Sequence, residues 1–485
     1  MENQSSGAEW IFLITIAITF FAAYLGGKHA RNREEQGLAN QSLNKWLIGL
    51  SAGATANSGF VVTGAVGLGY LYGFQWLFLP VAWLLGDIVF WYFFPSRINA
   101  TGRSSNATTL SEMLAHGLSG KTAKVASVIA TTIIVISLGG YISAQWLAGE
   151  KFLAGAFAMP NEVSLLMFAG IIIAYTSIGG FRGSVYADSV QAIIRIIGTL
   201  IAIGAVFFVA MNDAGFSANF HAAGEGFMQI LPGSSVATFV GFMLGFAAAA
   251  LGFGLGQPQL VSRYLAGSSP EETRSAWWIY IGFVQFTWIA MTLFGIILRG
   301  VMPGMEDPEQ GLSLFFSSHM GPWVTGIIVA DIFATIAATS NSLLVATSQA
   351  VLHDLLPKTI SSASAKKVSA FIVVLLGAAT MGGALLLAGK SSVFQVALSS
   401  VSLMGAGLAA PVIIKVMNWQ RTGASLLCSI CFGFLGAVVW KYIGMGSLLN
   451  EAAIGIMLGL MINWLVVYFS KNDSKIQNRM VEEEG

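Results

Sequence analysis

Two long apolar segments of the chain are interrupted at corresponding places by small and turn-prone residues. The first interruption runs from Ser51 to Gly59 and the second from Gly252 to Pro258. In hydrocarbon every backbone N–H and C=O needs a partner, so an unwound stretch persists at membrane depth only where it lines a cavity or binds something. Matched interruptions in two halves of a chain indicate a solute site between inverted repeats. The sequence therefore predicts a membrane transporter.

Composition supports a polytopic membrane protein. Of 485 residues, 55% are hydrophobic and 10% are charged, whereas about a quarter of residues are charged in soluble domains. The net charge of +1 leaves no basic stripe for nucleic acid. No metal-ligand cluster, nucleophile and base pair or phosphate loop stands out, so we expect neither an enzyme nor a cofactor.

At roughly 20 apolar residues per span, we expect an all-α protein with about thirteen transmembrane helices in a single domain. The helices are predicted to fall into a first helix, two repeats and a peripheral pair, followed by a charged tail. These parts are predicted at about 10–25, 43–211, 236–417, 426–468 and 469–485.

The distribution of Lys and Arg predicts the orientation, because short basic loops stay cytoplasmic. With the N-terminus outside, the outer loops hold only Lys151, Arg299, Lys390 and Lys441, and nearly all other basic residues fall inside. We expect a bacterial inner-membrane protein with its C-terminus in the cytoplasm. The expected partners are a small solute and the bilayer, with no obligate protein partner evident.

Three motifs give the chain a family resemblance. They are Trp46 to Ala54, Tyr175 to Phe181 followed by Asp188 to Gln191, and Gly256 to Pro258 followed by Arg263 to Ala266. Together they resemble the sodium:solute symporter family, most closely its proline-carrier-like branch. The resemblance covers nearly the whole chain. It implies a LeuT-type core of two inverted five-helix repeats that moves a small organic solute by alternating access.

The resemblance also implies a main sodium site between the first interruption and the helix predicted at 323–352. Its backbone carbonyls map to Ala54, Asn57 and Ala334, and its two hydroxyl positions map to Ala337 and Ala338. A methyl group cannot coordinate a cation, and an under-coordinated ion would keep an unmet desolvation cost. We therefore predict that this sodium site is lost.

Arg195 lies in the middle of the helix predicted at 185–211. An intramembrane arginine is expected to face the bundle and to have a partner. Helix geometry brings it to the depth of Asp331, about 10 Å outward from Asp188. We predict that Arg195 pairs with Asp331 and stands in for sodium, as a basic side chain does in sodium-independent transporters of similar fold. A purely structural ion pair is the alternative.

Asp188 matches an acid that, in some family members, helps to form a second sodium or proton-linked site. Its expected neighbours are Ser340 and Asn341. With few counter-charges Asp188 would carry a proton, and the alternatives are a displaced sodium site or a solvated acid at a helix N-terminus. The coupling ion is thus left open between Na⁺ and H⁺. Asp87 either lines the solute path or bonds to a neighbouring helix.

The expected solute site is polar and uncharged. Freed N–H groups at the interruptions suit a carboxylate, which indicates an amino-acid-like or carboxylate solute, whereas small residues around Phe253 argue against proline itself. Packing between helices is the alternative role for Tyr141 and Gln145. The candidate solute ligands are Thr55, Asn57, Ser58, Tyr141, Gln145, Phe253, Gln257, Gln395 and Ser399.

Two rival functions remain at this point. One is a true sodium symporter that uses the displaced site at Asp188, Ser340 and Asn341. The other is a sensor derived from a transporter, which binds solute without moving it; only a short charged tail follows Tyr468, and that argues against a sensor.

Overall fold

The computed structural model describes residues 2–28, 38–233, 235–356, 362–390 and 392–483. Within them the chain forms a helical bundle, and an isolated bridge between Leu43 and Gly267 is its β-type pairing. The long helices are α1 (Glu2–Lys28), α3 (Lys45–Ala56), α5 (Phe78–Phe93), α8 (Gly120–Phe157), α9 (Asn161–Asn212), α12 (Val236–Gly256), α15 (Trp277–Val301), α17 (Pro322–Ala350), α18 (Ser362–Leu387), α19 (Val393–Val416), α20 (Gly423–Tyr442) and α21 (Glu451–Glu483).

Shorter helices lie next to the helix breaks and between the long helices. They are α4 (Ala65–Tyr72), α6 (Pro95–Ser105), α7 (Leu110–Ala115), α10 (Phe216–His221), α11 (Glu225–Met228), α13 (Pro258–Leu265), α14 (Pro270–Ser275) and α16 (Gly311–His319). Among the described residues, 11 helical stretches are long and apolar enough to cross a membrane.

Two of these stretches each contain two crossings. The stretch Asn161–Asn212 has 52 residues, far more than the roughly 20 that span a bilayer, and it breaks at Gly180, where φ is 58°. The stretch Phe60–Phe93 turns at Gly73, where φ is 73°. A left-handed backbone of this kind favours glycine. With these two turns the structure agrees with the predicted set of transmembrane helices.

Both predicted interruptions are present as helix breaks. In the first, α3 ends at Ala56, and a π-helical turn at Phe60–Gly64 leads into α4. In the second, α12 ends at Gly256, and Gln257 adopts an extended conformation before α13 begins with Pro258. Proline suits this position because the first N–H of a helix has no partner within it.

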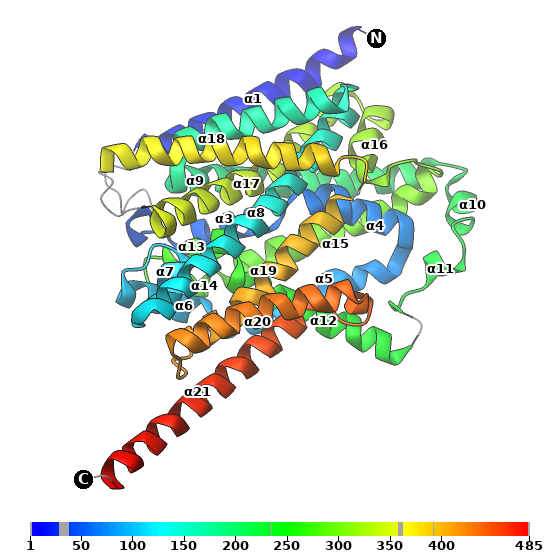
Figure 1. Ribbon diagram of the computed structural model, residues 1–485. Coiled ribbons are helices and arrows are strands. Elements are labelled where there is room, and N and C mark those ends of the chain that lie inside the picture. Colours follow the sequence, from blue (N-terminus) through cyan, green and yellow to red (C-terminus); the bar gives the residue numbers. More distant parts are fainter. Residues whose placement is uncertain (1, 29–37, 234, 357–361, 391, 484–485) are drawn as a thin grey trace.

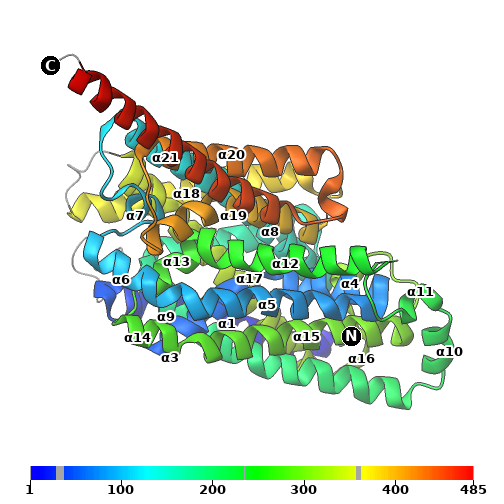
Figure 2. The same cartoon turned by 90° about the horizontal axis from the view of Figure 1, so that it is seen from below.

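Helix α17 forms the centre of the bundle. In its most apolar stretch of 18 residues 94% of the residues are buried, against 33% in that of α20. Helix α17 packs on α1, α8 and α9. Helix α12 packs between α5 and α19, and α20 and α21 lie at the edge against α19 (Figures 1 and 2). Helices α20 and α21 therefore form one edge of the bundle.

Helix α1 crosses α9 and α17 in direct backbone contact. A Cβ atom at Gly26 would lie 2.6 Å from the Cα of Gly183, and one at Gly27 would lie 2.9 Å from the carbonyl oxygen of Ile178. Small residues allow transmembrane helices to approach this closely. The first helix is thus joined to the centre of the bundle, and does not lie loosely beside it.

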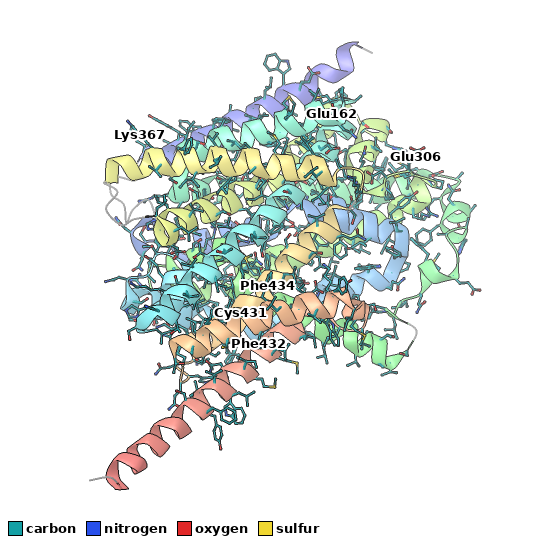
Figure 3. All side chains as sticks on the ribbon, viewed as in Figure 1. Glu162, Glu306, Lys367, Cys431, Phe432 and Phe434 are labelled. Carbon is teal, nitrogen blue, oxygen red and sulfur yellow. The ribbon has the colours of Figure 1, made fainter. Side chains whose placement is uncertain are left out.

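The two ends of the bundle carry different loops. The N-terminus and the C-terminus lie at opposite ends (Figure 1). Glu162 and Glu306 lie at one end, and Lys367 lies at the other (Figure 3). The predicted tail after residue 468 continues α21 as a helix to Glu483, which projects from the bundle (Figure 1).

Candidate functional site

A central cavity opens beside the first helix break. It lies between the break, α5, α8, α12, α15 and α19, and it is lined by Ala56, Ser58, Phe60, Leu79, Trp83, Tyr141, Phe246, Phe253, Trp288, Phe394, Ala397, Leu398 and Val401. None of these lining side chains is charged. Hydroxyl groups at Ser58 and Tyr141 are the polar groups in an otherwise apolar, aromatic wall. This lining suits a compact solute with an apolar body and few polar groups.

The aromatic rings of the cavity pack on one another. Phe60 lies 5.1 Å from Trp288 and 5.2 Å from Phe394, measured between ring centroids. Trp83 lies 5.2 Å from Trp288 and 5.5 Å from Phe253. Aromatic pairs at such distances are favourable. They make a continuous wall that joins the break to α5, α12, α15 and α19.

A charged vestibule adjoins the cavity. Phe394 lines both spaces, and beyond it Lys151 forms ion pairs with Asp307 and Glu309, each at 2.7 Å. The vestibule lies at the end of the bundle where Glu306 is found (Figure 3). Access from that end therefore passes Phe394.

The cavity includes three of the predicted solute ligands, Ser58, Tyr141 and Phe253. Two others turn away from it: the Thr55 hydroxyl donates to Ser342 Oγ at 3.0 Å, and the Asn57 amide donates to the Thr287 hydroxyl. These two side chains connect the break to α17 and α15.

Gln145 and Gln257 also hold the breaks. The Gly59 N–H donates to Gln145 Oε1 at 2.9 Å, and Gln257 Nε2 donates to the Val401 carbonyl at 3.4 Å. The expectation that freed N–H groups are open to a carboxylate is wrong for Gly59, because Gln145 already satisfies its N–H.

Gln395 and Ser399 do not line this cavity. Gln395 lines the vestibule, and the half-buried Ser399 accepts a hydrogen bond from Lys441. The cavity instead receives Phe394, Ala397, Leu398 and Val401, whose i, i+3, i+4 and i+7 spacing places them on one helix face. One residue of register turns a side chain by about 100°.

The region of the expected sodium site contains a hydroxyl that sequence reasoning missed. Ala334, Ala337 and Ala338 are buried on α17. The neighbouring Thr339 donates to the carbonyl of Thr55 at 2.9 Å and lies 3.5 Å from that of Ala54. The Ala54 carbonyl, one of the expected sodium ligands, thus has the neutral Thr339 hydroxyl beside it.

Arg195 and Asp331 lie in contact. Arg195 Nη1 is 2.7 Å from Asp331 Oδ2, and the two side chains are 1% and 0% exposed. Gly198 leaves room for the carboxylate, since a Cβ there would collide with it. Arg195 Nε and Nη2 have no hydrogen-bond partner among the described residues. The role of this pair in coupling stays a prediction.

Asp188 lies in a second buried pair. Its Oδ2 accepts hydrogen bonds from Arg263 Nη2 at 2.9 Å, Ser51 at 2.8 Å and Ser342 at 3.1 Å. Arg263 also donates to Ser51, Ser184 and the Gln259 carbonyl. The expectations of few counter-charges and of a solvated acid are wrong, because Arg263 approaches from α13 and Asp188 is fully buried.

Ser340 and Asn341 are not drawn into this cluster. The Ser340 hydroxyl donates to the Ile336 carbonyl at 2.7 Å, and Asn341 Nδ2 has no partner in the described part of the chain. The α17 side chain that contacts Asp188 is instead Ser342. Side chains one or two positions apart on a helix face different directions, which explains the difference.

Two matched helix breaks around a central cavity define a LeuT-type membrane transporter. A Na⁺-coupled sialic acid symporter, in a substrate-bound outward-open state, has this fold with a TM-score of 0.80 at 18% identity, covering 95% of this chain and 98% of that one. MhsT in complex with L-phenylalanine aligns with a TM-score of 0.55 at 14% identity, covering 87% and 99%.

Sequence relatives narrow the class. The model of the sodium:solute symporter family matches residues 37–430, and the chain belongs to this family. The high-affinity proline transporter PutP of Bacillus subtilis is 25% identical over 465 residues, covering 93% of this chain and 96% of that protein. The sodium/proline symporter of Escherichia coli K12 is 24% identical over 460 residues, covering 89% and 88%. The chain is a multi-pass secondary transporter, not an enzyme, and its partners are a small-molecule solute and the membrane.

Proposed function

We propose that the chain carries a compact amino-acid-like or carboxylate solute across the bacterial inner membrane, without sodium at the main site. The solute binds in the cavity between Ser58, Tyr141 and the aromatic wall. The repeats at about 43–211 and 236–417 alternate around it, with the N-terminus outside and the C-terminus in the cytoplasm. In that orientation the vestibule with Lys151 faces outward.

The observation that carries the proposal is the state of the expected sodium ligands. Methyl groups of Ala337 and Ala338 stand at the expected hydroxyl positions. The Thr339 hydroxyl donates a hydrogen bond to the carbonyl of Thr55 at 2.9 Å and lies 3.5 Å from that of Ala54. Sodium would need two further oxygens in place of these methyl groups. Without them the cost of dehydrating the ion is not offset.

A fixed positive charge nearby supports the same proposal. Arg195 reaches α17 from α9 and pairs with Asp331, one turn before Ala334 on α17. The guanidinium charge links α9 to α17 in the way that a bound cation would link two helices. Unlike a bound ion, the guanidinium cannot dissociate. Transport would then proceed without the sodium gradient.

A thermal-shift experiment tests the proposal. The purified protein is heated with L-proline, L-phenylalanine, sialic acid or pyruvate, in sodium salts and in potassium salts. Ligand binding stabilises the folded state by about 2.7 kcal/mol at a concentration of 100 times Kd. We expect equal shifts in both salts. A shift that requires sodium would overturn the proposal and favour the sodium symporter.

A gain-of-function variant sharpens this test. The triple variant Ala337→Ser, Ala338→Ser and Arg195→Gln restores two hydroxyls and removes the fixed charge. We expect ligand binding by this variant to become stronger in sodium than in potassium. Ala346→Ser, at another buried position of α17, is the matched control and should leave the salt dependence unchanged.

A further inference from the structure

Asp87 is a buried acid that the sites described above do not use. It lies in the middle of α5, with 1% of its surface exposed. Within the described ranges its Oδ2 atom has no hydrogen-bond partner, and no Lys, Arg or His there forms an ion pair with it. Asp188 and Asp331, the other fully buried acids at the centre of the bundle, each pair with an arginine.

The surroundings of Asp87 are aromatic and uncharged. Phe90 and Trp91 follow it by three and four positions, hence on the same helix face. The ring of Tyr264 lies 5.4 Å from each of them, and Trp91 lies 5.2 Å from Tyr280.

No nearby element supplies a compensating charge. Helix α12, which packs on α5, has no titratable side chain, and neither has the turn Gly73–Leu77. On α15, Arg299 stacks on Tyr70. On α6, Arg97 and Arg103 donate to backbone carbonyls, those of Phe93 and Gly267 among them. Arg263 of α13 is paired with Asp188.

An ionised carboxylate without a partner in such a place has a very large desolvation cost, and the group is neutralised instead. A protonated carboxyl has one O–H to donate and oxygen lone pairs to accept. Trp91 Nε1 and Tyr264 Oη, both buried without a hydrogen-bond partner in the described part, are groups that could turn toward Asp87 once it is ionised.

Asp87 is also placed to respond to the transport cycle. Trp83, one turn away on α5, lines the solute cavity and packs on Phe253 and Trp288. Helix α12 ends at the second helix break and packs closely on α5 at Gly86, where a Cβ atom would collide with Ala247. Movement of α12 relative to α5 would therefore change the access of water to the carboxyl.

We propose that Asp87 is the proton-binding group of the transport cycle and holds a proton in the conformation described here. Its carboxylate takes a proton from water on one side of the membrane, forming an O–H bond that breaks when water reaches it from the other side. The solute in the adjacent cavity and the proton cross together. The inference rests on the proposed function, and it names the coupling ion.

Infrared spectroscopy of the solute-free protein in lipid tests the protonation directly. We expect the C=O band of a protonated carboxyl at neutral pH, its loss in Asp87→Asn, and its retention in Glu162→Gln, which removes an exposed carboxyl at the end of the bundle (Figure 3). Asp87→Glu, which keeps a carboxyl, should shift the band. An unchanged band in Asp87→Asn would overturn the proposal.

Transport in proteoliposomes tests the coupling. The probe is radiolabelled L-proline or, if it is not taken up, the compound with the largest thermal shift, in potassium salts throughout. An inward gradient of one pH unit should drive about tenfold accumulation per proton in the wild type and in Glu162→Gln. Asp87→Asn should lose this accumulation and still exchange labelled for unlabelled solute.

The outcomes separate the two proposals. Accumulation by Asp87→Asn equal to that of the wild type would overturn the role of Asp87. A wild type that exchanges solute but does not accumulate it under a proton gradient would also overturn the role of Asp87. That result would leave the proposed function standing. A wild type that binds solute but neither accumulates nor exchanges it would overturn both.

Discussion

Two buried Arg–Asp pairs cross the centre of the bundle, and they are built differently. Arg263 donates to Asp188, to four hydroxyls and to the Gln259 carbonyl, so its nitrogens are all engaged. Arg195 donates to Asp331 alone and leaves Nε and Nη2 without partners within the described residues. The first pair is embedded in a polar network that fixes α13 against α3, α9 and α17. The second depends on one contact, which a modest rearrangement could remove.

The largest effect is expected at the networked pair. Arg263→Met removes the guanidinium and all of its hydrogen bonds, and it leaves Asp188 buried without a counter-charge. The variant should be less stable by about 5 kcal/mol. Thermal unfolding of the purified variant measures this. Arg263→Lys, which retains the charge, should recover part of the loss; equal losses in both variants would contradict the charge argument.

A smaller loss is expected at the single-contact pair. Arg195→Gln should cost about 3 kcal/mol, because Asp331 loses the one charged partner it has among the described residues. Adding Asp331→Asn should restore much of that stability, since a neutral amide pair then replaces the lone acid. Additive losses in the double variant would show that the two side chains do not act as a pair.

The same comparison can be tested through packing. Gly198→Ala places a methyl group against the Asp331 carboxylate and should destabilise the protein by about 1–3 kcal/mol. Gly204→Ala, two turns further on α9 with open space around it, is the matched control and should be neutral or slightly stabilising. The unfolding temperature should therefore fall in Gly198→Ala and should stay the same or rise slightly in Gly204→Ala.

The smallest effect is expected in the cavity, away from both pairs. Phe394→Ala removes a ring that contacts Phe60 and separates the cavity from the vestibule, so solute affinity should fall about tenfold, or about 1.4 kcal/mol. Gln395→Ala, on the next position of α19, should change it little. Isothermal titration with the solute found by thermal shift checks both; equal losses would restore Gln395 as a ligand.

The sequence was most informative where a residue violates a general rule of membrane structure. Helix breaks made of small residues and a lone arginine within an apolar helix are costly in a bilayer, and they could be located without a structure. The family's motifs then gave the helix order and the fold class. The predicted contact of Arg195 with Asp331 followed from helix depth alone.

Contacts that depend on helix rotation could not be predicted in the same way. The helices of this bundle are apolar on nearly every face, so hydrophobic periodicity does not say which face of α19 meets the cavity. The resemblance does not predict Thr339 as a contact of the break, because the family's ligand positions map to its neighbours Ala337 and Ala338. Nor does the sequence alone identify Arg263 as the buried partner of Asp188. Phe60 and Phe253, the aromatic residues at the two breaks, are the signal that the sequence offers for the cavity wall.

The glycine contacts between α1 and α9 have a practical consequence. With Gly26 of α1 against the backbone of Gly183, the first helix cannot slide along α9 without a steric clash or loss of this contact. We therefore expect helix α1 to move together with α9. Energy transfer between a fluorescent label near Trp10 and one on α9 should stay constant during alternating access. Energy transfer between the label near Trp10 and one on α5 or α12 should change.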